Sequence, residues 1–149
     1  MLEWRSAMNL LIVDDEYLVV EEVVTVTDWE LLGITEIYSA TNAVSAVRIL
    51  NEKKIDIMIC DIEMPQTDGL ELSKKAKENF PDLEIVMLTS HAEFNYVRNA
   101  LRYGCYDYLL KPVMEDDIIK VMKNLVTKIE RERHQAQLQE EGIVWNQLK

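Results

Sequence analysis

The sequence is poor in cysteine, glycine and proline, with only two, four and three of them among 149 residues. The scarcity of glycine and proline and the absence of low-complexity runs argue against extensive disorder and favour an ordinary globular protein. The two cysteines have no metal-ligand spacing, so we expect them to be small buried side chains in a reducing, cytoplasmic compartment. Long apolar runs are also missing: residues 10–13 are too few for a signal peptide, and no run is long enough to span a membrane.

Basic residues are scarce relative to acidic ones, which gives the chain a formal net charge of −11. The imbalance lies in the first 114 residues, which carry 20 acidic and 10 basic side chains. Such a chain repels nucleic acid and attracts cations or basic partners, so we expect no direct binding of nucleic acid. The length suits one domain with a proper core, together with an appendage.

A nearly unbroken apolar run at residues 55–60 is typical of a strand that is buried on both faces of a parallel sheet. Other apolar runs predict further strands, and segments with helical periodicity alternate with them. The predicted strands are residues 9–13, 36–40, 55–60, 85–88 and 106–110, and the predicted helices are residues 17–29, 43–50, 70–78, 92–103 and 115–129. Because each parallel return needs a crossover, this alternation predicts an α/β fold, a doubly wound five-stranded parallel sheet with helices on both faces.

Polar side chains follow four of the five predicted strands. Asp14 and Asp15 follow the first strand, Asp61 the third, Thr89 the fourth and Lys111 the fifth. Because the carboxyl ends of parallel strands meet at one edge of a sheet, we expect these side chains to lie close together. Any one of them alone fits a turn or cap residue. Four polar ends on an apolar sheet are unfavourable unless they are used, so the combination indicates a functional site.

Carboxylates crowded at one edge repel one another unless a hard cation lies among them, and oxygen ligands with room for water suit Mg²⁺. The predicted ligands are Asp15 and Asp61 directly, Asp14 through water, and the backbone carbonyl of Glu63. With its charge offset, Asp61 is predicted to attack phosphorus and become an acyl phosphate. Lys111 and the Thr89 hydroxyl are then predicted to bind two of the phosphoryl oxygens.

The motifs around these residues resemble those of the receiver domain of bacterial two-component response regulators. The motifs are residues 10–16, 61–69, 88–89 and 108–112, in family-like order and spacing. The resemblance implies a flavodoxin-like sheet of order 2-1-3-4-5, Mg²⁺, phosphorylation of Asp61 by a sensor histidine kinase, and slow self-dephosphorylation. Such a protein is a regulator rather than an enzyme, because it catalyses at most its own phosphoryl transfer. Residues 94–112 further resemble receivers that precede AraC-type DNA-binding domains, so the implied output is transcription regulation.

The resemblance also implies a role for each site residue. Asp14 and Asp15 match the acidic pocket, Asp61 the phosphoacceptor, Thr89 the switch hydroxyl, Lys111 the phosphoryl-binding lysine and Tyr108 the switch aromatic. Phosphorylation is expected to draw Thr89 toward Asp61 and leave space that Tyr108 fills. The surface of the fourth helix, the fifth strand and the start of the fifth helix should then change its affinity for partners, a second copy of the chain included. Glu63 and His91 occupy flanking positions that tune dephosphorylation in the family.

The chain divides into three segments on this interpretation. Residues 1–7 are an N-terminal extension, residues 8–129 the receiver domain, and residues 130–149 a linker or helical extension toward an output domain outside this sequence. Good helix formers after residue 129 predict that the fifth helix is prolonged, and Gly142 is expected to end it. Two alternatives stay open for this extension, a solvated linker helix and a dimerising helix.

Two rival functions use a similar sheet. A haloacid-dehalogenase-like phosphatase also uses an Asp nucleophile, a hydroxyl, a lysine and Mg²⁺, but its motif needs a second Asp where this chain has Glu63. Its acidic pair also comes late in the chain rather than at Asp14 and Asp15. A flavodoxin-like cofactor-binding module needs a phosphate loop rich in Gly, Ser or Thr after the first strand, and this sequence has none there.

Overall fold

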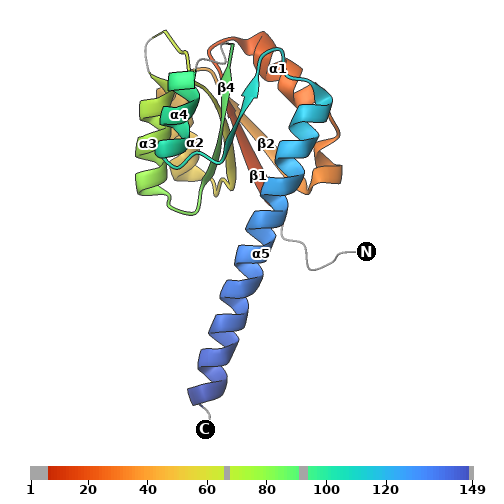
Figure 1. Ribbon diagram of the computed structural model, residues 1–149, viewed down its shortest axis with the longest axis vertical. Coiled ribbons are helices and arrows are strands. Elements are labelled where there is room, and N and C mark those ends of the chain that lie inside the picture. The colour runs from red at the N-terminus through yellow and green to blue at the C-terminus, as the bar shows by residue number, and fades with distance from the viewer. Residues whose placement is uncertain (1–6, 66–67, 91–93, 148–149) are drawn as a thin grey trace.

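A five-stranded parallel sheet forms the centre of the computed structural model, which describes residues 7–65, 68–90 and 94–147 (Figure 1). The strands are β1 (Met8–Val13), β2 (Ile34–Ala40), β3 (Ile57–Asp61), β4 (Glu84–Thr89) and β5 (Asp107–Leu110). They lie in the order β2-β1-β3-β4-β5, and each neighbouring pair is parallel. The predicted flavodoxin-like fold and its strand order are therefore confirmed.

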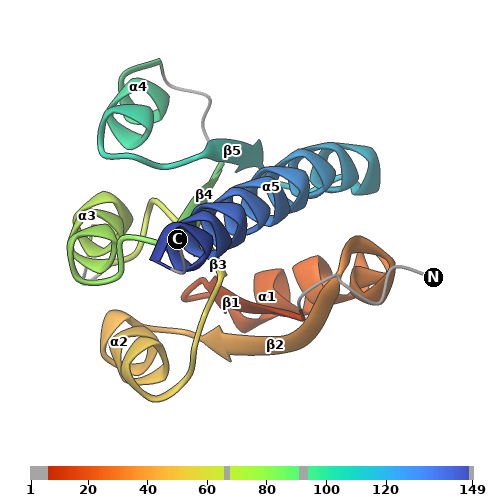
Figure 2. The same ribbon diagram turned by 90° about the horizontal axis from the view of Figure 1, so that it is seen from below.

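Helices cover both faces of the sheet. They are α1 (Tyr17–Thr25), α2 (Ala43–Glu52), α3 (Gly69–Asn79), α4 (Phe94–Arg102) and α5 (Glu115–Gln147), with a short 3-10 helix, η1 (Trp29–Leu32), after α1. Side chains of α1, η1 and α5 join one hydrophobic core, and those of α2, α3 and α4 join the other. Figure 2, viewed from below, shows these two helical layers on either side of the sheet.

The central strand β3 is buried along its whole length, which explains its unbroken apolar sequence. Ile57 and Ile59 contribute to the core under α1 and α5, whereas Met58 and Cys60 contribute to the core under α2, α3 and α4. Each such side chain stabilises the fold by about 2 kcal/mol through burial of apolar surface. This packing fixes the position of Asp61 at the end of the strand.

The first helix is shorter than predicted, because α1 ends at Thr25 rather than near Trp29. The indole Nε1 of Trp29 donates hydrogen bonds to the carbonyls of Val23, at 3.2 Å, and Val24, at 3.1 Å. Trp29 thus folds back over the end of α1 and starts η1. Gly33 ends η1 with φ of 91°, a left-handed conformation that favours glycine.

The last helix is longer than predicted, because α5 continues through Gly142 to Gln147. The prediction that Gly142 ends the helix is therefore wrong. A helical glycine costs about 1 kcal/mol relative to alanine, and the good helix formers around it tolerate that cost. The prediction that the extension is helical is correct, and Figure 1 shows this half of α5 projecting from the domain.

Both cysteines are buried, as the sequence predicts. Burial raises the pKa of Cys60, and it raises the pKa of Cys105 to about 11, so both thiols stay protonated at neutral pH. Among the described residues, none of the helices combines the length and the apolar composition that crossing a bilayer requires.

Candidate functional site

Side chains from four strands meet at the carboxyl edge of the sheet. Asp14 directly follows β1, Asp61 ends β3, and Thr89 ends β4. Lys111 follows β5, and its backbone N–H donates a hydrogen bond to the carbonyl of Thr89 at 2.9 Å. Asp14, Asp61 and Thr89 are buried and Lys111 is half-buried. The parallel strand order therefore gathers residues that are far apart in the sequence at one edge.

Asp61 has two donors close to one carboxylate oxygen. Its Oδ1 accepts a hydrogen bond from the backbone N–H of Glu63 at 3.1 Å and lies 3.3 Å from Nζ of Lys111. Gly69 at the start of α3 approaches Asp61 so closely that an added Cβ would lie 1.9 Å from its carbonyl oxygen. Glu63 and the first turn of α3 thus hold the strand end in place.

Lys111 also forms an ion pair with Asp14, with 2.7 Å between Nζ and Oδ2. The other oxygen, Oδ1 of Asp14, accepts a hydrogen bond from the backbone N–H of Glu16 at 2.9 Å. Despite the short ion pair, the buried Oδ2 accepts no hydrogen bond of good geometry among the described residues. Asp14 therefore keeps a buried acceptor atom that a metal ion or water could use.

The protonation of Asp61 and Lys111 reflects this crowding. Burial raises the pKa of Asp61 to about 6 and the Asp14 carboxylate adds to the rise, while Lys111 and the Glu63 N–H partly oppose it. Burial alone would lower the pKa of Lys111, but the Asp14 and Asp61 carboxylates outweigh burial and raise it. Lys111 is thus held as a cation between two acids. Asp61 takes up a proton more readily than an ordinary aspartate unless a further positive charge lies beside it.

Asp14, Asp15 and Asp61 offer carboxylate oxygens that all lie within 4.8 Å of one another. Asp15 is exposed, so water has access to this side of the group. Several oxygen ligands with access for water fit a hard divalent cation such as Mg²⁺. The three acids could therefore hold a metal ion, while the contribution of the Glu63 carbonyl stays a prediction.

Thr89 and Tyr108 lie on the neighbouring strands β4 and β5. In the register of these strands Thr89 is paired with Leu110 and Tyr108 with Met87, so Thr89 and Tyr108 point to the same face of the sheet. Tyr108 is half-buried and packs against the core under α2, α3 and α4. The two residues thus share a face of neighbouring strands, and their coupled movement stays a prediction.

Two positions complete the comparison with the sequence. His91 lies outside the described residues, whereas Glu63 is exposed next to Asp61. Gly69 is only a loop signal in the sequence, yet its backbone contact with Asp61 makes it part of the site's support. A glycine directly before a helical segment, where alanine would be the better helix former, was the signal that could have shown this.

Comparison with known proteins points to one family. The sequence model of the response regulator receiver domain matches residues 10–123. The uncharacterized transcriptional regulatory protein YesN of Bacillus subtilis (strain 168) is 34% identical over 124 residues, which are 83% of this chain and 34% of YesN. Other curated relatives are 28% to 32% identical, and this chain covers about half of their length, 49% to 52%. This chain thus covers about a third to a half of these relatives.

Solved structures agree with the sequence comparison. The receiver domain of AraT, a response regulator from Geobacillus stearothermophilus, has a TM-score of 0.74 at 29% identity, covering 89% of this chain and 99% of that domain. A two-component transcriptional regulator AraC from Clostridium phytofermentans ISDg has a TM-score of 0.78 at 23% identity, covering 85% of this chain and 98% of that one, and it supports the fold.

Proposed function

Because the chain belongs to the response regulator receiver family, we propose that Asp61 accepts a phosphoryl group from a sensor histidine kinase. The observation that carries this proposal is the position of the buried Asp61 carboxylate, 3.3 Å from Lys111 and grouped with Asp14 and Asp15. A carboxylate oxygen of Asp61 attacks phosphorus, and the bond between phosphorus and the kinase histidine breaks. The electron pair of that bond stays with the imidazole nitrogen, and Asp61 becomes an acyl phosphate.

The neighbouring residues have complementary roles in this proposal. Lys111 pairs with one phosphoryl oxygen, and the Thr89 hydroxyl donates a hydrogen bond to another. A Mg²⁺ ion on the three acids, with the Glu63 carbonyl as a further ligand, would offset the charges of the phosphoryl group and Asp61. Glu63 and His91 would tune the hydrolysis of the phosphoryl group.

We propose that phosphorylation switches the domain through Thr89 and Tyr108. Movement of the Thr89 hydroxyl toward the phosphoryl group leaves space on the face toward which Tyr108 already packs. Burial of the Tyr108 ring in that space changes the surface formed by α4, β5 and the start of α5. A kinase, an output domain or a second copy of the chain would be sensitive to that change.

The segments outside the sheet complete the proposal. Residues 8–129 act as the receiver, and residues 130–149 lead to an output domain that regulates transcription, in a cytoplasmic protein. YesN, of which this chain spans 34%, is a transcriptional regulatory protein, and residues 94–112 resemble receivers that precede AraC-type domains. The output domain rather than this acidic chain would bind DNA.

Incubation of the chain with acetyl phosphate and Mg²⁺, followed by intact mass measurement, tests the proposal. One hydroxylamine-labile phosphoryl group is expected on the wild type and on Asp116→Asn, whose side chain is exposed on α5, and none on Asp61→Asn. Lys111→Gln should lower the rate about 100-fold, because it removes a positioned cation. Rapid multiple turnover of phosphate esters would instead support the phosphatase alternative.

A further inference from the structure

Two buried acids lie at the amino edge of the sheet, opposite the phosphorylation site. Asp56, just before β3, is 6% exposed, and Glu84, the first residue of β4, is 8% exposed. They are neighbours, because the backbone N–H of Glu84 donates a hydrogen bond to the Asp56 carbonyl at 3.0 Å. Burial of a carboxylate is unfavourable unless the carboxylate is paired. The partners of Asp56 and Glu84 therefore indicate the role of these two acids.

Asp56 connects two strands with the last helix. Its Oδ2 accepts a hydrogen bond from the backbone N–H of Asn9 in β1 at 2.7 Å. Its Oδ1 forms an ion pair with Nη2 of Arg133 in α5. Both oxygens of Asp56 are thus engaged, one within the sheet and one with α5.

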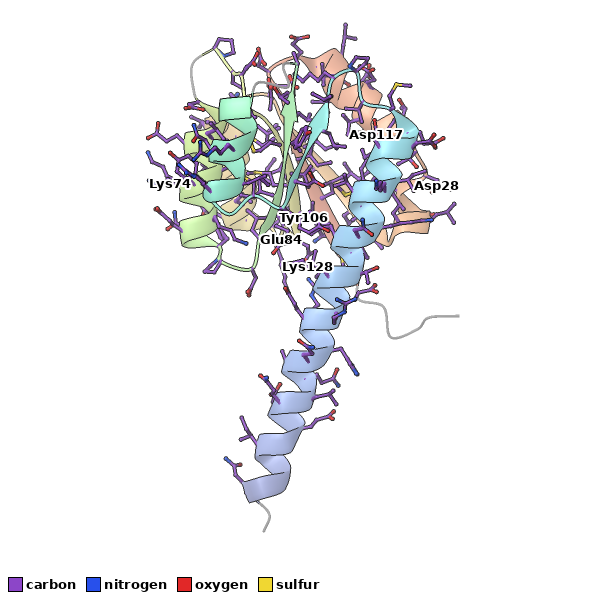
Figure 3. The ribbon with its side chains drawn as sticks, viewed as in Figure 1. Asp28, Lys74, Glu84, Tyr106, Asp117 and Lys128 are labelled. Atoms are coloured by element: carbon purple, nitrogen blue, oxygen red, sulfur yellow. The ribbon has the colours of Figure 1, made fainter. Side chains whose placement is uncertain are left out.

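Glu84 makes the second connection to α5. Its Oε1 lies 3.0 Å from Nζ of Lys128 in α5 and 3.6 Å from Nζ of Lys77 in α3. Figure 3 shows Glu84 and Lys128 where α5 passes the lower end of the sheet. Glu84 therefore links helices from both faces of the sheet at the point where α5 leaves the domain.

These contacts lie at the point along α5 where the helix leaves the domain. The apolar stripe of α5 ends at Ile129, and residues 134–143 are exposed. Lys128 and Arg133 flank this end of the stripe, and among the described residues their ion pairs to Glu84 and Asp56 attach α5 to the sheet just before the helix projects from the domain. We propose that Asp56, Glu84, Lys128 and Arg133 form a latch that fixes the direction of the projecting half of α5 relative to the sheet.

The latch also lies on the two strands that carry the phosphorylation chemistry. β3 follows Asp56 and ends at Asp61, and β4 starts at Glu84 and ends at Thr89. β3 and β4 thus connect the latch on α5 directly with Asp61, the proposed phosphoacceptor, and Thr89, the proposed switch hydroxyl. This last step rests on the proposed function, whereas the latch itself does not.

Spin labels on exposed positions of β2 and α5, introduced as Glu36→Cys and Gln139→Cys, test the latch by pulsed electron-electron distance measurement. The native thiols are buried and protonated, so they should not be labelled. The doubly labelled chain in which the latch residues are intact is expected to give one narrow distance distribution. Lys128→Gln combined with Arg133→Gln should raise the population outside that peak about tenfold, because both hydrogen-bonded charge pairs are lost.

A matched pair of changes on the same helix provides the control. Lys123→Gln combined with Arg131→Gln removes the same charge from exposed side chains and should leave the distribution narrow. A broad distribution in the unmodified latch, or a narrow one after its loss, would overturn the proposal. Phosphorylation from acetyl phosphate should be unchanged in the latch variant, since Asp61 lies about 16 Å away along β3. A failure to phosphorylate any variant would count against the proposed function and leave the latch result standing.

Discussion

Asp61 lies in a site that disfavours its charged form, and this has a consequence for stability. Its pKa is about 6 in the folded chain against an ordinary value of 3.8, so protonation of Asp61 favours folding. That contribution is fully present below pH 3.8 and is lost as the pH rises through about 6. Without metal at pH 7.5, Asp61→Asn is therefore expected to raise the free energy of unfolding by about 3 kcal/mol.

Urea unfolding in the presence of a chelator measures this difference. The gain should shrink when the pH is lowered from 7.5 to 4.5, because wild-type Asp61 then takes up its proton. Asp116→Asn removes an exposed acid and serves as the control, with a change of less than about 0.5 kcal/mol. A gain for Asp61→Asn that is the same at both pH values would contradict the raised pKa.

Gly69 gives a second prediction at the residue scale. A Cβ there would lie 1.9 Å from the carbonyl oxygen of Asp61 and 2.9 Å from Cα of Ile62, so the backbones of β3 and α3 must separate. Gly69→Ala is expected to lower the free energy of unfolding by about 3 kcal/mol, as overpacking does in a tight site. Thermal and urea unfolding measure it, and an unchanged stability would show that the contact is not needed.

The polar site residues could be predicted from the sequence because they interrupt apolar strands. Asp61 and Lys111 each follow an apolar run in the sequence, and a parallel sheet brings such ends together. Gly69 could not be assigned in this way, because a close approach of two backbones leaves no trace in the composition. The ion pair between Asp14 and Lys111 likewise depends on side-chain directions that strand periodicity does not give.

At the scale of elements, periodicity and capping predicted most of the fold. α2 starts directly after Asn42, a residue type that favours N-caps, and the Asn42 side chain accepts a hydrogen bond from the N–H of Ser45 at 2.8 Å. The errors arose where tertiary contacts or context outweigh a local signal. The hydrogen bond from Trp29 to the carbonyl of Val23, six residues earlier, accompanies the early end of α1. Gly142 stays helical because no left-handed turn is required there.

Gly142 therefore supplies a prediction for α5. A Cβ at this position meets nothing within 4 Å, so Gly142→Ala removes the flexibility of glycine without a clash. Exchange of amide hydrogens in the last turns of α5 should become about fivefold slower, which corresponds to about 1 kcal/mol of helix propensity. Hydrogen exchange with mass spectrometry measures this effect.

The sheet serves as the internal control for that experiment. Peptides from β3 and β4 should exchange at the same rate in Gly142→Ala and in the wild type, because none of the described side chains after Ile129 in α5 belongs to either hydrophobic core. An unchanged rate in the last turns of α5 would mean that this end of the helix is already stable without the change.

At the scale of the whole molecule, a net charge of −11 makes cations stabilising in two distinct ways. Monovalent salt screens the general repulsion and should act weakly. Mg²⁺ on Asp14, Asp15 and Asp61 should act at much lower concentration and raise the free energy of unfolding by about 2–3 kcal/mol near 100 times its dissociation constant.

Asp15→Asn should abolish most of the Mg²⁺ effect, whereas Asp28→Asn should retain it. Both changes remove one exposed acid, but Asp28 lies just before η1 and outside the acidic group (Figure 3). Melting temperature measured across a Mg²⁺ titration distinguishes them. An equal response of both variants would show that Mg²⁺ acts by general charge screening rather than by binding at the three acids.

The direction of α5 has a practical consequence for handling the protein. The projecting half of α5 leaves the domain at the amino edge of the sheet (Figure 1). Asp61 and Lys111 lie at the carboxyl edge. A chain immobilised on a sensor surface through the end of α5 would stand upright, with Asp61, the proposed phosphoacceptor, at the edge of the sheet that lies away from the surface. Such a tether leaves the approach of a bulky phosphodonor unobstructed, and a chain anchored through the loop after β3 would lose that access.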